Sequence, residues 1–189
     1  MIRMARTARP VSRTGIYHVM MRGVNKEAVF AQESDKKVLR HLFYAKKSSL
    51  EVVIYSYCIM NNHFHMLMQC PMEDLSKFFH LAVGAYAIYY NKTKDRSGHV
   101  FDNRYKSECV EEESYFWNCL RYIHNNPCKA GLTDIPHQYI YSSFQEYLNQ
   151  KSYILHPKAI QLYRQHFGSE KAFREFHQGN SLNSFLDTQ

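Results

Sequence analysis

The sequence predicts an α+β protein with a ferredoxin-like (RRM-like) antiparallel sheet, helices packed mainly on one face, and a short helical tail at the C-terminus. The 189 residues are 45% apolar and 15% aromatic, which is enough for the core of one domain. Apolar spacings follow the order strand, helix, strand, strand, helix, strand, as in a split βαβ fold. Asn61 and Asn62 separate two apolar runs, which predicts a tight hairpin turn.

Four segments have the apolar and aromatic character of strands. They cover residues 15–22, 50–60, 63–69 and 101–110. The fourth begins with basic and aromatic residues side by side. That pattern suits either contact with a phosphate backbone and an unpaired base, or an ordinary edge strand protected by charges.

Helical spacing of apolar residues marks three longer segments and two short ones. They cover residues 34–47, 75–90 and 114–126, and two patterns within 156–178 that Gly168 separates. Pro127 is expected to end the third helix, because proline disfavours helical backbone in the residue before it. We therefore expect one domain over 15–148, preceded by a basic arm over 1–14 and followed by a helical extension over 149–189.

The chain is basic, with 24 Lys and Arg against 17 Asp and Glu and a net charge of +7. This balance favours polyanionic partners, nucleic acid first. The N-terminal arm holds four of the arginines and reads either as a segment that follows phosphates or as a solvated tail. These arginines are Arg3, Arg6, Arg9 and Arg13.

Cysteine and hydropathy patterns indicate a cytoplasmic protein with no membrane partner. The five cysteines are odd in number and show no Cys-x-x-Cys spacing, which argues against a disulfide framework or a zinc finger. No run approaches the roughly twenty apolar residues that cross a bilayer, and the N-terminus lacks the apolar core of a signal peptide.

His63 and His65 bracket Phe64 in the third predicted strand. Alternate side chains of a strand share a face, so both imidazoles are expected to point one way and Phe64 the other. Two histidines at this spacing can chelate one metal ion, although both are also compatible with ordinary strand histidines. His18 is expected to be a structural strand residue.

A divalent ion held by two histidines needs at least one further protein ligand, and the side-chain oxygen of Asn126 is suitable. Tyr122 lies one turn earlier on the same helix face, so a helix that presents Asn126 also presents Tyr122. The alternatives are that Asn126 caps the helix and that Tyr122 lies at the surface. Spacing alone does not distinguish Tyr122 from Tyr115 as a reactive phenol.

Five stretches stand in an order that characterises a known family. They are Tyr17-His18-Val19 with Arg22-Gly23, Tyr57 to His65, Gly98 to Ser107, Arg121 to Leu132 (Arg-Tyr-Ile-His-Asn-Asn-Pro-Cys-Lys-Ala-Gly-Leu), and Tyr141-Ser142-Ser143. Together they resemble the single-tyrosine transposases of the HUH endonuclease superfamily, and most of all the REP-associated tyrosine transposases. The likeness runs over residues 15–147.

The resemblance implies an enzyme that cuts single-stranded DNA beside hairpins with Mg²⁺ or Mn²⁺. It implies His63, His65 and Asn126 as metal ligands and Tyr122 as the nucleophile that forms a 5′-phosphotyrosine link. We expect DNA contacts first from Arg104 and Lys106, then from Arg13 and Arg22. A monomer is favoured over a homodimer.

Two other functions remain open at this level. One is a non-catalytic nucleic-acid-binding regulator on a ferredoxin-like sheet, since that fold alone does not fix a function. The other is a zinc-bound structural protein that uses His63, His65 and a cysteine, which the cysteine spacing disfavours.

Overall fold

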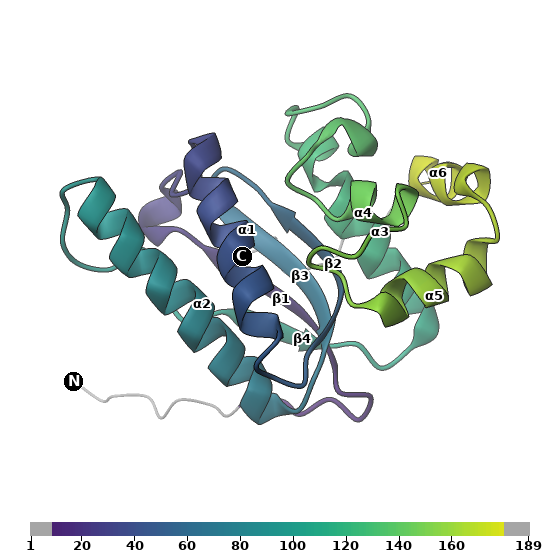
Figure 1. The fold of residues 1–189 in the computed structure, drawn as a ribbon, viewed down its shortest axis with the longest axis horizontal. Coiled ribbons are helices and arrows are strands. Elements are labelled where there is room, and N and C mark those ends of the chain that lie inside the picture. Colours follow the sequence, from purple (N-terminus) through teal and green to yellow (C-terminus); the bar gives the residue numbers. More distant parts are fainter. Residues whose placement is uncertain (1–8, 180–189) are drawn as a thin grey trace.

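A computed structural model describes residues 9–179, so Arg3 and Arg6 of the predicted arm and residues 180–189 of the predicted extension lie outside the described residues. Its centre is a four-stranded antiparallel sheet with the order β2-β3-β1-β4 (Figure 1). The strands are β1 (Ile16–Arg22), β2 (Val53–Ile59), β3 (His63–Gln69) and β4 (Lys106–Cys109). With β1 and β3 in the middle, this order confirms the predicted ferredoxin-like fold.

One face of the sheet is covered by α1 (Glu33–Lys47) and α2 (Met72–Thr93), which also pack on each other (Figure 1). Phe64 of β3 points into this layer, with ring centroids 5.2 Å from Phe43 of α1 and 5.9 Å from Phe79 of α2. All three side chains are buried, and each contributes about 2–3 kcal/mol of hydrophobic free energy. The predicted separation of Phe64 from its flanking histidines therefore has a packing basis.

The opposite face carries α3 (Glu113–Lys129), which packs against β2 and β3. The chain then forms α4 (Phe144–Leu148), α5 (Pro157–Phe167) and α6 (Glu170–Gln178) on the same side (Figure 1). Two short 3₁₀ turns, Val24–Lys26 and Pro136–Gln138, complete the elements. The expected packing of helices on one face of the sheet therefore describes α1 and α2, while α3 to α6 form a second helical layer on the other face.

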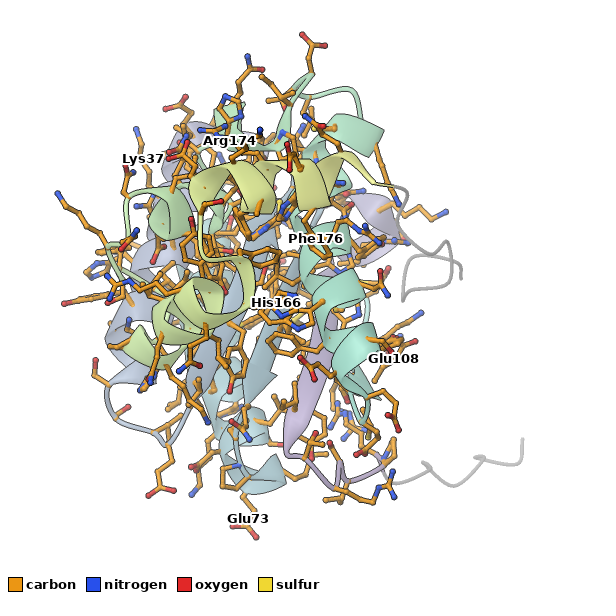
Figure 2. All side chains as sticks on the ribbon, turned by 90° about the vertical axis from the view of Figure 1, so that its right-hand side faces the viewer. Lys37, Glu73, Glu108, His166, Arg174 and Phe176 are labelled. Carbon is orange, nitrogen blue, oxygen red and sulfur yellow. The ribbon has the colours of Figure 1, made fainter. Side chains whose placement is uncertain are left out.

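A stripe on the outer side of α3 docks α5 and α6. Three contacts join the stripe to these helices: Trp117 stacks on His166 with ring centroids 3.9 Å apart, the Arg121 guanidinium lies 4.7 Å from the centroid of the Phe176 ring, and His124 hydrogen-bonds His177. Figure 2 shows α6 lying across the outside of α3, with Phe176 labelled beside that helix and His166 labelled on α5. Positions 117, 121 and 124 are four and three residues apart, so they share one face of α3.

Residues 153–155, before α5, are held from two sides. The carboxylate of Glu146 accepts the backbone N–H groups of Tyr153, Ile154 and Leu155, and the ammonium of Lys47 donates to their carbonyl oxygens. Glu146 also accepts the hydroxyl of buried Tyr57. Two charges therefore satisfy the polar backbone of a largely buried segment that has no regular secondary structure.

Two predicted boundaries are wrong. The helix that carries Tyr122 does not end before Pro127 but continues to Lys129, with Ala130 N–H closing the last turn on Asn126 C=O. A proline near the end of a helix forfeits only one hydrogen bond, so the last turn can form around it. The fourth strand begins at Lys106 rather than residue 101, because Phe101 makes only an isolated bridge with Gly23.

Within the described residues, no helix combines the length and the apolar character that crossing a bilayer requires.

Candidate active site

His63 and His65 lie on the face of β3 that is turned toward α3, and their ring centroids are 5.0 Å apart. His65 is fully buried in the middle of the sheet, opposite Met20 of β1 and Cys58 of β2. His63 is partly buried beside the Asn61-Asn62 turn, where β3 begins. The structure therefore places the two predicted imidazoles side by side at one end of the sheet.

The side chain of Asn62 fixes the orientation of His63. Its amide nitrogen donates to the carbonyl of Lys26, which turns its Oδ1 toward His63 Nδ1 at 2.7 Å. An amide oxygen only accepts, so His63 must carry its proton on Nδ1 and keep a lone pair on Nε2. This is the tautomer that a histidine needs to ligate a metal through Nε2.

His65 is joined to a third histidine, His18, which the sequence analysis expected to be a structural strand residue. His18 of β1 is fully buried, and its Nε2 lies 2.9 Å from Nδ1 of His65, with the two rings stacked at 5.1 Å. The carboxylate of Glu108 on β4 lies 3.8 Å from His18 Nδ1 and accepts the hydroxyl of Tyr115 at 2.8 Å. The nearby imidazole of His18 lowers the pKa of Glu108, and the hydrogen bond from Tyr115 makes a smaller contribution in the same direction.

Tyr122 of α3 lies edge-on against these histidines. Its ring centroid is 5.4 Å from that of His65 and 6.0 Å from that of His18. Lys129, two turns further along α3, places its ammonium 4.8 Å from the ring centroid, and burial lowers the pKa of that lysine. Only 4% of Tyr122 is exposed and its hydroxyl oxygen is buried, so a substrate reaches that oxygen only after local rearrangement.

Asn126 lies one turn beyond Tyr122 on the same face of α3 and is 5% exposed. Its side-chain nitrogen is buried and has no hydrogen-bond acceptor among the described residues. An amide can be turned by 180° at little steric cost, which would aim its oxygen in that direction instead. This buried polar atom fits a third oxygen ligand better than a helix cap, since Pro127 does not end the helix.

Other donor sets do not form in the described part of the chain. Between residues 9 and 179, no group of three or more His, Cys, Asp or Glu side chains is arranged to hold a metal ion. Any site built on His63 and His65 must therefore draw on other donors, such as the amide of Asn126 or the phosphate of a substrate.

Of the four basic residues expected at DNA, two lie beside the histidines in the sheet. Arg22 is directly opposite His63 on β1, and Lys106 of β4 is opposite Met20, which in turn faces His65. Arg104 is exposed in the loop that leads into β4. Arg13 lies beyond the far end of β1, where it bonds to Glu111. Six residue steps along β3, from His63 to Gln69, separate it from His63 by about 20 Å.

Sequence reasoning missed Glu108 and Lys129, and it expected His18 to be only a structural strand residue. The approach of Glu108 to His18 depends on β1 lying between β3 and β4, which a local pattern does not reveal. Lys129 was hidden by the expectation that the helix ends before Pro127.

Comparison with known proteins gives consistent similarities. The family model described as "Transposase IS200 like" matches residues 12–126, more than half of the chain. A Haemophilus influenzae protein named as a REP-associated tyrosine transposase is 26% identical over 107 residues, which are 51% of this chain and 61% of that protein. The chain thus spans less than two thirds of the length of this relative.

Among solved structures, a REP-associated tyrosine transposase bound to a REP hairpin has a similar fold. The TM-score is 0.64 with 15% sequence identity, over 78% of this chain and 87% of that one. At this level of identity the likeness establishes the fold.

Proposed function

The chain belongs to the IS200-like transposase family, and from this premise we propose that it is a metal-dependent endonuclease and strand transferase for single-stranded DNA at hairpin-bearing repeats. The observation that carries the proposal is the contact of the Tyr122 ring with His65, the more buried of the two strand histidines. His63 adjoins His65 on β3, and the buried amide of Asn126 lies one turn beyond Tyr122 on α3. A hairpin is also the ligand of the REP-associated transposase whose fold this chain shares.

Tyr122 supplies the nucleophile. Its hydroxyl loses a proton as the oxygen attacks the scissile phosphorus in line, and the bond from phosphorus to the 3′ oxygen breaks. The 3′ oxygen takes up one proton and leaves as a 3′-hydroxyl, so the number of protons is unchanged. The product is a 5′-phosphotyrosine link. A 3′-hydroxyl of a second strand reverses the step and releases Tyr122. One phosphodiester replaces another, so joining requires no external energy source.

His63, His65 and Asn126 would hold a Mg²⁺ or Mn²⁺ ion. Both histidine and side-chain oxygen ligands suit such ions, and the buried amide of Asn126 fits the third position. When bound, the ion polarises the scissile phosphate and stabilises the charge that develops on it. The chain's own contribution is to hold the imidazoles in the right tautomer and the phenol beside them.

Arg104, Lys106 and Arg22 would bind the DNA backbone next to the cut site, because they lie at the His63 end of the sheet or on its α3 face. Arg13 would contact DNA only away from the scissile phosphate. The nucleophile and the histidines come from one chain, since α3 packs on its own sheet. This arrangement supports a monomer as the active unit.

The decisive experiment measures covalent protein–DNA adducts on a labelled hairpin oligonucleotide with Mn²⁺. Tyr122→Phe should abolish the adduct while hairpin binding persists, because only the hydroxyl is lost. Tyr44→Phe, at an exposed position on α1, is the matched control and should form the adduct normally. An undiminished adduct in Tyr122→Phe would show that Tyr122 is not the nucleophile.

The second candidate is a DNA-binding regulator without catalysis, and the burial of the Tyr122 hydroxyl is the observation in its favour. The same experiment separates the two functions. A regulator binds the hairpin but forms no adduct even in the unmodified protein.

A further inference from the structure

We propose that Glu108 and His18 are positioning residues that fix the tautomer and ring orientation of His65, so that its Nε2 faces the metal site. The inference deepens the proposed function and rests on it, because it assigns His65 a metal-ligating role. Neither residue would touch substrate or metal. They act through His65 from two neighbouring strands.

The strand register brings the three groups into one row. Glu108 of β4 is paired directly with His18 of β1, so both side chains lie on the face that carries His65. His18 pairs with Leu67 of β3, two residues from His65 on the same face. Nε2 of His18 is 2.9 Å from Nδ1 of His65, and the Glu108 carboxylate is 3.8 Å from Nδ1 of His18.

The direction of these contacts follows from the carboxylate. An ionised Glu108 only accepts, so it favours a proton on His18 Nδ1. Neutral His18 then has a bare Nε2, which must accept the proton on His65 Nδ1. His65 in turn has a bare Nε2, on the side of the ring away from His18. A charge on β4 thereby determines which nitrogen of the buried His65, two strands away, keeps the lone pair that a metal ligand needs.

Burial makes this ordering effective. His18 and His65 are both fully buried, so water cannot readily supply alternative partners for Nε2 of one ring and Nδ1 of the other. Stacking of the two rings at 5.1 Å with a 25° interplanar angle restricts their rotation. His63 has the same tautomer because of Asn62, but the two hydrogen bonds responsible involve only residues at or beside the hairpin turn and Lys26.

The row also reaches the helix that bears the nucleophile. Tyr115 donates its hydroxyl to Glu108 at 2.8 Å and lies seven residues, or two turns, before Tyr122 on α3. Glu108 is labelled beside α3 in Figure 2. One carboxylate therefore positions both His65 and the helix that holds the phenol against it.

Nuclear magnetic resonance of the metal-free protein tests the tautomer directly. Long-range ¹H–¹⁵N spectra of ¹⁵N-histidine protein, with His65 assigned from the His65→Gln variant, should show the His65 proton on Nδ1. His18→Leu should convert His65 to a mixture of tautomers. His18→Gln should preserve the wild-type state, because the glutamine oxygen can accept the same proton. A His65 proton on Nε2 in the unmodified protein would overturn the proposal.

Calorimetric titration with Mn²⁺ alone measures the consequence for binding. His18→Leu should weaken Mn²⁺ affinity about tenfold or more, the usual cost of losing an outer partner of a ligand, and His18→Gln should stay within about threefold of wild type. If His18→Leu does not fold, Glu108→Leu at the partly exposed end of the row is used, with Glu112→Gln on the surface as control. Equal affinities in wild type and the leucine variant would refute the positioning role.

The two measurements separate this inference from the function on which it rests. If the unmodified protein binds no Mn²⁺, the proposed metal site is contradicted. The NMR measurement still shows whether Glu108 and His18 control the tautomer of His65. If Mn²⁺ binds and its affinity is the same with and without His18, the metal site is supported and the positioning role of His18 is refuted.

Discussion

Replacement of His177 by glutamine is expected to make the fold less sensitive to acid. His177 is buried where α6 meets α3; its Nδ1 donates to the carbonyl of Phe173 and its Nε2 accepts from His124 Nδ1. Burial lowers the pKa of His177 to about 4, and Arg121 nearby acts in the same direction. Glutamine offers one donor and one acceptor group for the same two bonds and does not titrate.

The sign follows from proton uptake. Below pH 6.5, the ordinary value for histidine, the unfolded chain binds a proton at position 177 that the folded protein takes up only near pH 4. The stability contributed by neutral His177 is therefore complete above pH 6.5 and is lost as the pH falls toward 4. At pH 5 the loss amounts to about 2 kcal/mol of the free energy of unfolding.

Urea denaturation at pH 7.5 and pH 5.0, followed by the fluorescence of Trp117, the single tryptophan, provides the assay. When the pH is lowered from 7.5 to 5.0, the urea midpoint of His177→Gln should fall by about 0.7 M less than that of wild type, for an m value of about 3 kcal/mol/M. His124 keeps a strongly lowered pKa in both proteins, so some acid sensitivity remains in the variant. His80→Gln, at an exposed position on α2, should behave as wild type. Midpoints of wild type and His177→Gln that fall in parallel would refute the reasoning.

Three further predictions concern stability, metal and DNA. Glu146→Ala should lower the free energy of unfolding by about 3–5 kcal/mol, because it removes the acceptor of three backbone N–H groups and a buried hydroxyl. Urea midpoints measure this change, and a loss below about 1 kcal/mol would contradict the stabilising role of Glu146. His63→Ala should eliminate Mn²⁺-dependent cleavage with an unchanged circular dichroism spectrum, and full cleavage by this variant in excess chelator is the opposing result. Lys106→Gln should weaken single-stranded DNA binding and reduce the slope of log K against log salt by about 0.7, whereas Lys77→Gln on the outside of α2 should not; equal slopes would exclude Lys106 from the phosphate path.

Local patterns were sufficient for the sheet and for two pairs of site residues. The period of two along residues 63–69 predicted the bounds of β3 and the common face of His63 and His65. The four-residue interval between Tyr122 and Asn126 placed both on one side of a helix, and both are buried there. Selecting Tyr122 rather than Tyr115 required the family resemblance. In the structure, Tyr115 instead bonds to Glu108.

Features that depend on long-range register or on a balance of small energies could not be predicted from local patterns. The approach of His18 to His65 needs β1 to lie beside β3 in one particular register. The continuation of α3 past Pro127 reflects one lost hydrogen bond against several gained by the last turn. The docking of α5 and α6 on α3 depends on aromatic contacts between segments about fifty residues apart, such as His124 with His177.

The stripe at positions 117, 121 and 124 has a mechanical consequence. Because α5 and α6 are held on α3 by a stacked ring, a guanidinium over a ring and a buried imidazole pair, the helix of the proposed nucleophile Tyr122 and these two helices form one packed unit. A rigid-body movement of these three helices away from the sheet would expose the Tyr122 phenol and preserve these three contacts, but it would break the hydrogen bond of His124 to Ser56 and the packing of α5 on β2. The hydroxyl of Tyr122 would then become accessible through movement at the interface between α3 and the sheet, and α5 and α6 would move together with α3.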